Sequence, residues 1–375
     1  MLAALKNARS LTFCQAAVYT GNIISPMAAN ISLATAVTTT QFNNQLNNFM
    51  NVLSSERHSI SQKVAQGMVS NPAYEGARGD GVKLAWKYEQ ADVALGGKGA
   101  GNFNAGQRQE ILENGKLRNY EGHHINSVKN APEHQGNPDN VIMLEEHRDG
   151  SGPRNHFDAH DRIWKNQTSG DMLDRDGMLE KTNSKRVFRN ELSGLGIAIS
   201  IGAGIGFALS FIVSLAKSGV SIENVETAII GGMKASLETG GMAAMGFTVG
   251  RVTAIVLEGV GMNLTENLAV VCNMTIVGVI TIAIFSAYQY FKLRCGEMYA
   301  DEALSVICRQ TMFSLSLLTV SIIAQGAFGG VAGLIVSTSI GLVFLGYTTV
   351  SSVHQRKLGE RLREFAIEQY KPNFA

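Results

Sequence analysis

The sequence predicts a mainly α-helical protein in which a small strand–strand–helix unit precedes a C-terminal domain of several membrane-spanning helices. Two observations support this fold class. Six of the eight histidines lie between His123 and His160, in a polar block rich in turn-forming residues. From Ser193 onward the composition changes, and long runs contain no Asp, Glu, Lys or Arg. With 375 residues, the chain is long enough for two or three domains.

The first region, residues 1–93, is predicted to be helical but poorly defined. Residues 1–55 carry little charge and are rich in Ala, Thr, Asn and Ser, which indicates loose helix. They are only weakly apolar, so they do not resemble a standard secretory signal. Residues 56–93 have mixed charge and indicate helix and turn, with Trp86 and Tyr88 as core candidates.

The second region spans residues 94–190 and begins with a Gly-rich stretch, residues 94–107. This stretch lacks the GxxxxGK(S/T) order of a nucleotide-phosphate loop, so we expect a flexible linker there. The sequence RQEILENGKLR at 108–118 indicates a short helix that is closed by Gly115. The chemistry of this region is therefore expected beyond residue 118.

The histidine block has the spacing of a metal site combined with a general base. Neighbouring residues on a strand face opposite sides, so His123 and His124 can take different roles. His156 and His160 are four residues apart, which puts both on one face of a helix. Asn140 lies in a predicted turn, where its side chain can bond to backbone and fix the loop. Together these residues predict a β-hairpin and a helix with a metal ion between them.

Hydrolysis of a phosphodiester bond needs groups of these kinds. The attacking water must lose a proton, and negative charge develops on the phosphate and on the leaving oxygen. A neutral imidazole can accept the proton, and a divalent cation can stabilise the charge. Structural zinc is the alternative, but zinc sites of that kind usually recruit thiolates, and the block contains no cysteine. An open, catalytic coordination position is therefore favoured.

The block resembles the HNH or Endonuclease VII-like (ββα-metal) nucleases, and in particular the GHH-type group of bacterial polymorphic toxins. The resemblance covers about 50 residues, 119–170. It rests on four elements in order: Gly122-His123-His124, then Asn140 within Pro138-Asp139-Asn140-Val141, then His156-Phe157-Asp158-Ala159-His160, and then Trp164 to Gly170.

The resemblance implies a role for each of these residues. The metal ligands would be His123, His156 and His160, and the ion would be Mg²⁺, Mn²⁺, Ni²⁺ or Zn²⁺. His124 would be the general base, and Asn140 the structural asparagine of the catalytic site. The interval before His156 is longer than usual and contains His147, which is the alternative ligand; His156 is favoured because it has an i+4 partner.

The net charge of +1 argues against a protein that is basic throughout, so any nucleic-acid-binding surface must be a local cluster of basic residues. Arg154, Arg162 and Lys165 are the predicted substrate-binding residues, because Arg and Lys supply most contacts to phosphate. A solvated surface explains the same charges nearly as well. The resemblance favours DNA as the substrate, cut to 5′-phosphate and 3′-hydroxyl ends.

The third region, residues 191–354, is predicted to be a helical transmembrane domain. The uncharged runs 193–216 and 267–291 each reach the length of about 20 apolar residues that one span requires. The run 310–353 is long enough for two spans. The Gly- and Met-rich residues 225–262 fit a tilted helical hairpin, an interfacial pair or part of a bundle core. A large soluble helical bundle is the alternative for the whole region.

Basic residues flank these runs at 181–189, at 292–294 and in the basic tail, residues 355–375. A four-span arrangement puts all three clusters on one side of the membrane, as the positive-inside rule requires. The histidine block and the tail would then share the cytoplasmic face of a bacterial inner membrane.

The sequence as a whole predicts a membrane-associated, metal-dependent nuclease. It would act as an antibacterial toxin that is secreted and delivered into target cells, or as a defence nuclease against phage DNA. The expected partners are nucleic acid and a lipid membrane, with an immunity protein or a secretion chaperone as the resemblance suggests, and the oligomeric state is left open. The rival is a pore-forming or channel-like membrane protein whose histidine block is a regulatory or structural metal domain.

Overall fold

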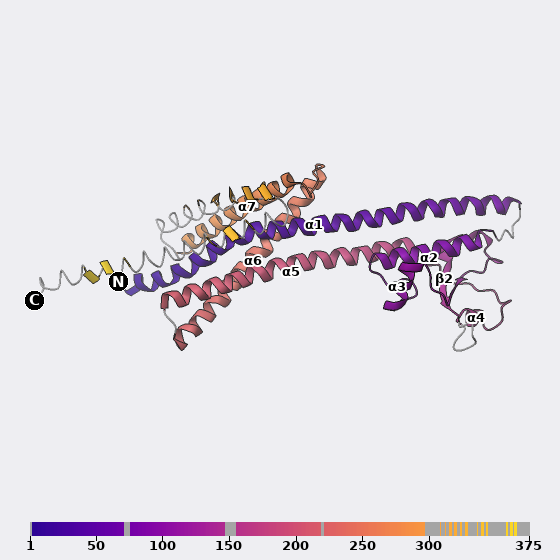
Figure 1. The fold of residues 1–375 in the computed structure, drawn as a ribbon, viewed down its shortest axis with the longest axis horizontal. Helices are drawn as coiled ribbons and strands as arrows, with labels where there is room; N and C mark the ends of the chain where they lie inside the picture. The colour runs from indigo at the N-terminus through magenta and orange to yellow at the C-terminus, as the bar shows by residue number, and fades with distance from the viewer. Residues whose placement is uncertain are drawn as a thin grey trace, which may run out of the picture. The chain divides into compact units, whose positions relative to one another are not determined.

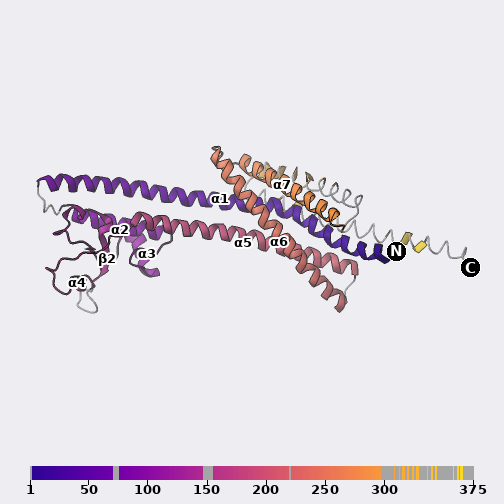
Figure 2. The same ribbon diagram turned by 180° about the vertical axis from the view of Figure 1, so that it is seen from behind.

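The computed structural model describes residues 2–70, 76–146, 155–218 and 221–296, together with single positions between 308 and 365. Figures 1 and 2 show that helices make up most of the chain, which confirms the predicted mainly α-helical class. The chain divides into two compact units, one formed by Thr39–Asn190 and the other by Met1–Thr38 with Glu191–Ala375. Each unit is described by itself.

Helix α1 (Leu2–Ser70) is continuous, whereas the sequence predicted only loose helix for its first part. Within the Thr39–Asn190 unit it places Leu53, Ile60 and Val64 on one face, because they are seven and four residues apart. All three side chains are buried and pack with the next helix, α2 (Arg78–Ala94). Burial of this face, more than intrinsic helix propensity, therefore fixes this part of α1.

Helices α2 and α3 behave largely as the sequence predicts. Trp86 and Tyr88 of α2 are both buried, which confirms them as core residues. Helix α3 (Ala105–Asn114) begins with a capping box on Asn104 and ends at Gly115, whose φ of 74° favours glycine. The predicted helix end at Gly115 is confirmed.

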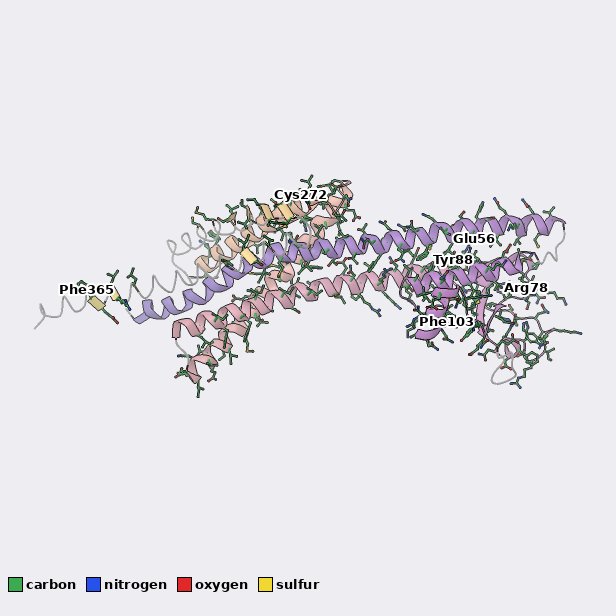
Figure 3. The ribbon with its side chains drawn as sticks, in the orientation of Figure 1. Glu56, Arg78, Tyr88, Phe103, Cys272 and Phe365 are labelled. Atoms are coloured by element: carbon green, nitrogen blue, oxygen red, sulfur yellow. The ribbon has the colours of Figure 1, made fainter. Side chains whose placement is uncertain are left out.

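The Gly-rich stretch before α3 is folded against α2, so the predicted flexible linker is wrong. The Gly99 N–H donates to Asp92 Oδ2 and the Ala100 N–H donates to Glu89 Oε2, both at 2.8 Å. Phe103 is only 1% exposed and anchors the end of the stretch in the core (Figure 3). Two carboxylates on one face of α2 thus accept the backbone hydrogen bonds that water would accept from a solvated loop.

A two-stranded antiparallel sheet carries the histidine doublet. Strand β1 (Tyr120–His124) pairs with β2 (Val141–Glu145), with His123 opposite Ile142 and His124 opposite Val141. The loop between the strands contains two short 3-10 turns, η1 (Pro132–His134) and η2 (Pro138–Asn140), and the short helix α4 (Asn155–Ala159) follows. The predicted order of strand, loop, strand and helix is confirmed.

The sheet rests on an apolar core shared with α2 and α3. Its buried members come from all of these elements and from the Gly-rich stretch: Ala85, Trp86, Val93, Phe103, Ile111, Leu117, Val141 and Met143. The Phe103 ring lies 6.3 Å from Trp86 and 5.7 Å from Tyr120, measured between ring centroids. The site on β1 is therefore built on packed, regular structure.

The second unit is a helical assembly. It contains the first part of α1, the apolar part of α5 (Arg175–Ser218), α6 (Ile222–Gly259) and α7 (Asn267–Arg294). Glycines let α5 approach α6 closely: a Cβ at Gly202 would lie 2.7 Å from the Ala243 Cβ. Arg251 of α6 forms two hydrogen bonds with Glu191 of α5, at 2.6 and 2.8 Å.

The predicted transmembrane domain is supported only in part. Among the described residues, α5 and α6 are long and apolar enough to cross a membrane, and α7 contains a shorter apolar stretch. Residues 225–259 form one continuous helix, so the hairpin and the interfacial pair are wrong for this segment. Most of the 310–353 run lies outside the described residues, so the multi-span domain stays a prediction. The exposed face of α6 carries large apolar side chains: Ile229, Ile230, Met233, Leu237, Val252, Ile255 and Val256.

Candidate metal centre and active site

The hairpin and α4 bring three histidines together. One ligand nitrogen from each of His123, His156 and His160 lies within 4.8 Å of those of the other two. Their ring centroids are 5.0 to 5.5 Å apart. His123 and His156 are buried and His160 is half-buried. The structure thus assembles the three imidazoles that the sequence grouped as ligands: His123 from β1, His156 from α4 and His160 from the turn that follows α4. The predicted placement of His156 and His160 on one helix is wrong for His160, because α4 ends at Ala159.

Two of these imidazoles are oriented by hydrogen bonds from their Nδ1 atoms. The His156 Nδ1 lies 3.2 Å from Glu121 Oε2, and the His160 Nδ1 donates to the Asn166 carbonyl at 2.9 Å. A histidine that binds metal through one nitrogen usually donates its other N–H to a carboxylate or a carbonyl, which fixes the tautomer. The Nε2 atoms of both residues are therefore the available ligand atoms.

The protonation state of His123 also fits a metal ligand. Burial, and then the neighbouring His156 and His160, lower the pKa of His123 from 6.5 to about 4. The ring is therefore neutral near pH 7, and a ligand imidazole must be neutral to donate its lone pair. A neutral His123 beside two further imidazoles suits a divalent cation of the catalytic kind.

His124 is held differently from the other three. Its Nε2 donates to the Gln135 carbonyl at 2.9 Å, so the neutral ring carries a lone pair on Nδ1. Burial is the main cause of a lowered pKa for His124, which favours this neutral form. Among the described residues, the Nδ1 atom has no hydrogen-bond partner. The ring is thus fixed by one nitrogen and can accept a proton at the other.

Asn140 organises the loop that supports this arrangement. Its Oδ1 accepts from the Asn126 backbone N–H at 2.8 Å, and its Nδ2 donates to the Asn126 carbonyl at 2.9 Å. The Ile125 N–H also donates to the Asn140 carbonyl at 2.8 Å. The side chain is fully buried, so its contacts are those of a residue that fixes the loop.

Comparison with protein families identifies this segment. Residues 71–145 match the family described as GHH signature containing HNH/Endo VII superfamily nuclease toxin. The resemblance inferred from the motifs is therefore confirmed. Comparisons with curated proteins and with solved structures found no match.

The GHH match covers α2, α3 and the hairpin but ends before α4. It therefore includes His123, His124 and Asn140, whereas the grouping of His156 and His160 with them rests on the geometry of the structure. The match also begins upstream of residue 94, where the sequence placed the start of the nuclease domain. The predicted domain boundaries stay predictions.

A pocket of about 640 Å³ opens beside His123 and His124. It contains two cations, Arg78 at the start of α2 (Figure 3) and Lys129 in the hairpin loop. Among the described residues, no carboxylate lies within ion-pair distance of either one. Its other lining residues are His123, His124, Ser127, Val128, Pro132, His156, His160, Trp164, Asn166 and Gln167.

The predicted substrate-binding residues lie elsewhere or cannot be placed. Arg162 is exposed, is paired with Asp158 at 2.8 Å and does not line the pocket, and Lys165 is also exposed outside it. Arg154 and the alternative ligand His147 lie outside the described residues. Arg78 was missed, because nothing in its local sequence shows that α2 begins at the pocket.

Gly81 of α2 permits the contact that orients His124. A Cβ at this position would lie 2.8 Å from the Gln135 carbonyl oxygen, which accepts from His124. For a nuclease such as the family match describes, we expect Gly81→Ala to displace this carbonyl and to slow nucleic-acid cleavage roughly tenfold to a hundredfold, because small misplacements of reacting groups are costly. Gly79→Ala is the matched control, since a Cβ there meets nothing within 4 Å. Equal rates for the two variants would contradict the role of this contact.

Proposed function

We propose that this chain is a metal-dependent nuclease that hydrolyses phosphodiester bonds, with DNA as the favoured substrate. The observation that carries the proposal is the convergence of His123, His156 and His160, with His124 next to His123 on the same strand. The family match supports it, because it describes a nuclease toxin. In this proposal the three converging imidazoles hold one divalent cation and His124 is the general base.

The residues of the chain provide the proton transfer and the positioning. His124 Nδ1 takes the proton from the attacking water, while the hydrogen bond from Nε2 to Gln135 keeps the ring aimed. Glu121 and the Asn166 carbonyl hold His156 and His160 in the tautomer that presents Nε2. A divalent ion, when bound, would supply positive charge to the phosphate and to the leaving oxygen.

Arg78 and Lys129 supply the contacts to substrate phosphate in this proposal. Both line the pocket with the histidines, and a guanidinium can bind two phosphate oxygens at once. Both side chains are exposed, so a substrate phosphate can reach them. Arg162 and Lys165 are left with a weaker, peripheral role, since they lie outside the pocket.

A plasmid-nicking assay on the full-length protein tests the proposal. We expect cleavage with at least one of Mg²⁺, Mn²⁺, Ni²⁺ and Zn²⁺ and none in EDTA. His160→Ala removes one proposed ligand. We expect it to reduce metal affinity roughly a hundredfold or more, because losing a residue that only hydrogen-bonds to a ligand already costs about 10- to 100-fold. His58→Ala, which changes an exposed histidine of α1, is the control. Cleavage that persists in EDTA, or a wild type that cuts nothing with any ion, would overturn it.

The setting of this activity is also a proposal. We propose an antibacterial toxin whose apolar helices associate with a membrane and whose nuclease unit acts in the cytoplasm of a target cell. The exposed apolar faces of α5 and α6 support this, and the family match supports the toxin role. An immunity protein would protect the producing cell. Defence against phage DNA is the alternative role for the same chemistry.

A further inference from the structure

Trp164 is unusually placed for a tryptophan. It lines the pocket beside the converging histidines, and 52% of it is exposed. Its ring centroid lies 4.9 Å from that of Phe157, 5.4 Å from His156 and 5.7 Å from His160. These contacts hold the ring in place and leave about half of its surface open.

Neither the proposed proton transfer nor the proposed metal binding uses the exposed surface of the Trp164 ring. A flat aromatic ring that is fixed but exposed is the usual platform for a nucleobase, because every base has a π face. Arg78 and Lys129 in the same pocket can hold the phosphate backbone beside it. Asn166 and Gln167 also line the pocket and offer polar groups for a base edge.

We propose that Trp164 stacks on an unpaired base next to the cleaved phosphate, so that single-stranded or locally opened nucleic acid is the preferred substrate. A base inside an intact duplex is already stacked on both faces and is not free to enter a pocket. The inference rests on the proposed nuclease function and adds a substrate class to it. Trp164 also contacts two proposed ligands, so a purely supporting role is the competing explanation.

The fluorescence of the full-length protein tests this directly. The chain has two tryptophans, and Trp86 is buried in the core, so Trp164 is the one that an oligonucleotide can reach. In EDTA, which prevents metal-dependent cleavage, we expect a single-stranded 12-mer to quench Trp164 emission and a blunt duplex of the same sequence to quench it much less. Equal quenching by both, or none by the single strand, would overturn the inference without any variant.

Variants separate stacking from support. We expect Trp164→Leu to weaken binding of the single strand roughly tenfold or more and Trp164→Phe to weaken it less, as base stacking on an aromatic ring predicts. Ile163→Ala, an exposed neighbour, is the control. Calorimetric affinity for Ni²⁺ should be unchanged in Trp164→Phe, and a parallel loss of metal affinity would show that the ring only supports the ligands.

The two proposals fail in different ways. If the wild type cleaves DNA but the variants at Trp164 cleave single strands and duplexes with unchanged KM, the inference about Trp164 alone is wrong. If the wild type binds single strands through Trp164 but cleaves nothing with any ion, the nuclease proposal is wrong.

Discussion

His124→Ala is expected to slow phosphodiester cleavage roughly 10²- to 10⁴-fold, the range that a positioned general base contributes. The substitution removes the nitrogen that would take the proton from water. It leaves His123, His156 and His160, so metal affinity should stay within about twofold of the wild type. Single-turnover cleavage at saturating metal measures the first quantity, and calorimetry with the same ion measures the second.

The pairing of these two measurements makes the prediction specific. His160→Ala should lose metal affinity as well as activity, whereas His124→Ala should lose activity alone. If His124→Ala also lost the metal, His124 would be a ligand, and the assignment of the doublet would have to be reversed. If it retained wild-type activity, another group would be the base.

The same variant separates the nuclease from its rival in cells. A nuclease predicts a toxic wild type that degrades plasmid DNA and a harmless His124→Ala variant. A pore-forming protein predicts ion leakage and loss of membrane potential that persist in His124→Ala, because the apolar helices are unchanged. Plasmid degradation without loss of membrane potential would rule out the pore-forming hypothesis.

The parts of the site that could be predicted from sequence are those set by local spacing. The doublet His123-His124 on a strand, the i+4 pair His156 and His160, and the turn at Asn140 each depend on a few adjacent residues. The helix end at Gly115 is of the same kind, because a left-handed residue after a helix favours glycine. Local rules were sufficient for all of them.

The parts that could not be predicted depend on contacts between distant residues. The Gly-rich stretch looked flexible because its hydrogen-bond acceptors, Glu89 and Asp92, lie on another element and look like ordinary surface charges in the sequence. Arg78 reaches the pocket only because α2 packs under the hairpin. The Asn166 carbonyl that orients His160 belongs to the backbone, so no residue type could have indicated it.

Arg175 shows most clearly how a distant residue fixes the site. It is 2% exposed, and its Nη1 donates to Glu89 Oε1 at 2.9 Å. Its Nε donates to the Pro138 carbonyl and its Nη2 to the Val141 carbonyl, both at 2.8 Å. One guanidinium at the start of α5 therefore clamps both sides of the turn that carries Asn140.

We expect Arg175→Ala to lower the free energy of unfolding of this unit by about 3–5 kcal/mol, because it leaves Glu89 as a buried carboxylate without its cation. Trp86 lies in the adjoining core, so its fluorescence during urea unfolding reports this unit. Arg162→Ala is the matched control: it breaks an exposed pair with Asp158 and should cost at most about 1 kcal/mol.

A double variant tests the cause of this loss. Arg175→Met with Glu89→Gln removes both charges together, keeps similar volumes and lets the Gln oxygen still accept from the Ala100 N–H. It should therefore be clearly more stable than Arg175→Ala, since replacing a buried ion pair by neutral groups of similar volume costs much less than breaking it. If the double variant were as unstable as Arg175→Ala, the loss would come from the missing hydrogen bonds to Pro138 and Val141, and the clamp on the turn would be the larger contribution. Nicking assays on the folded double variant would then show how far Asn140 depends on that clamp.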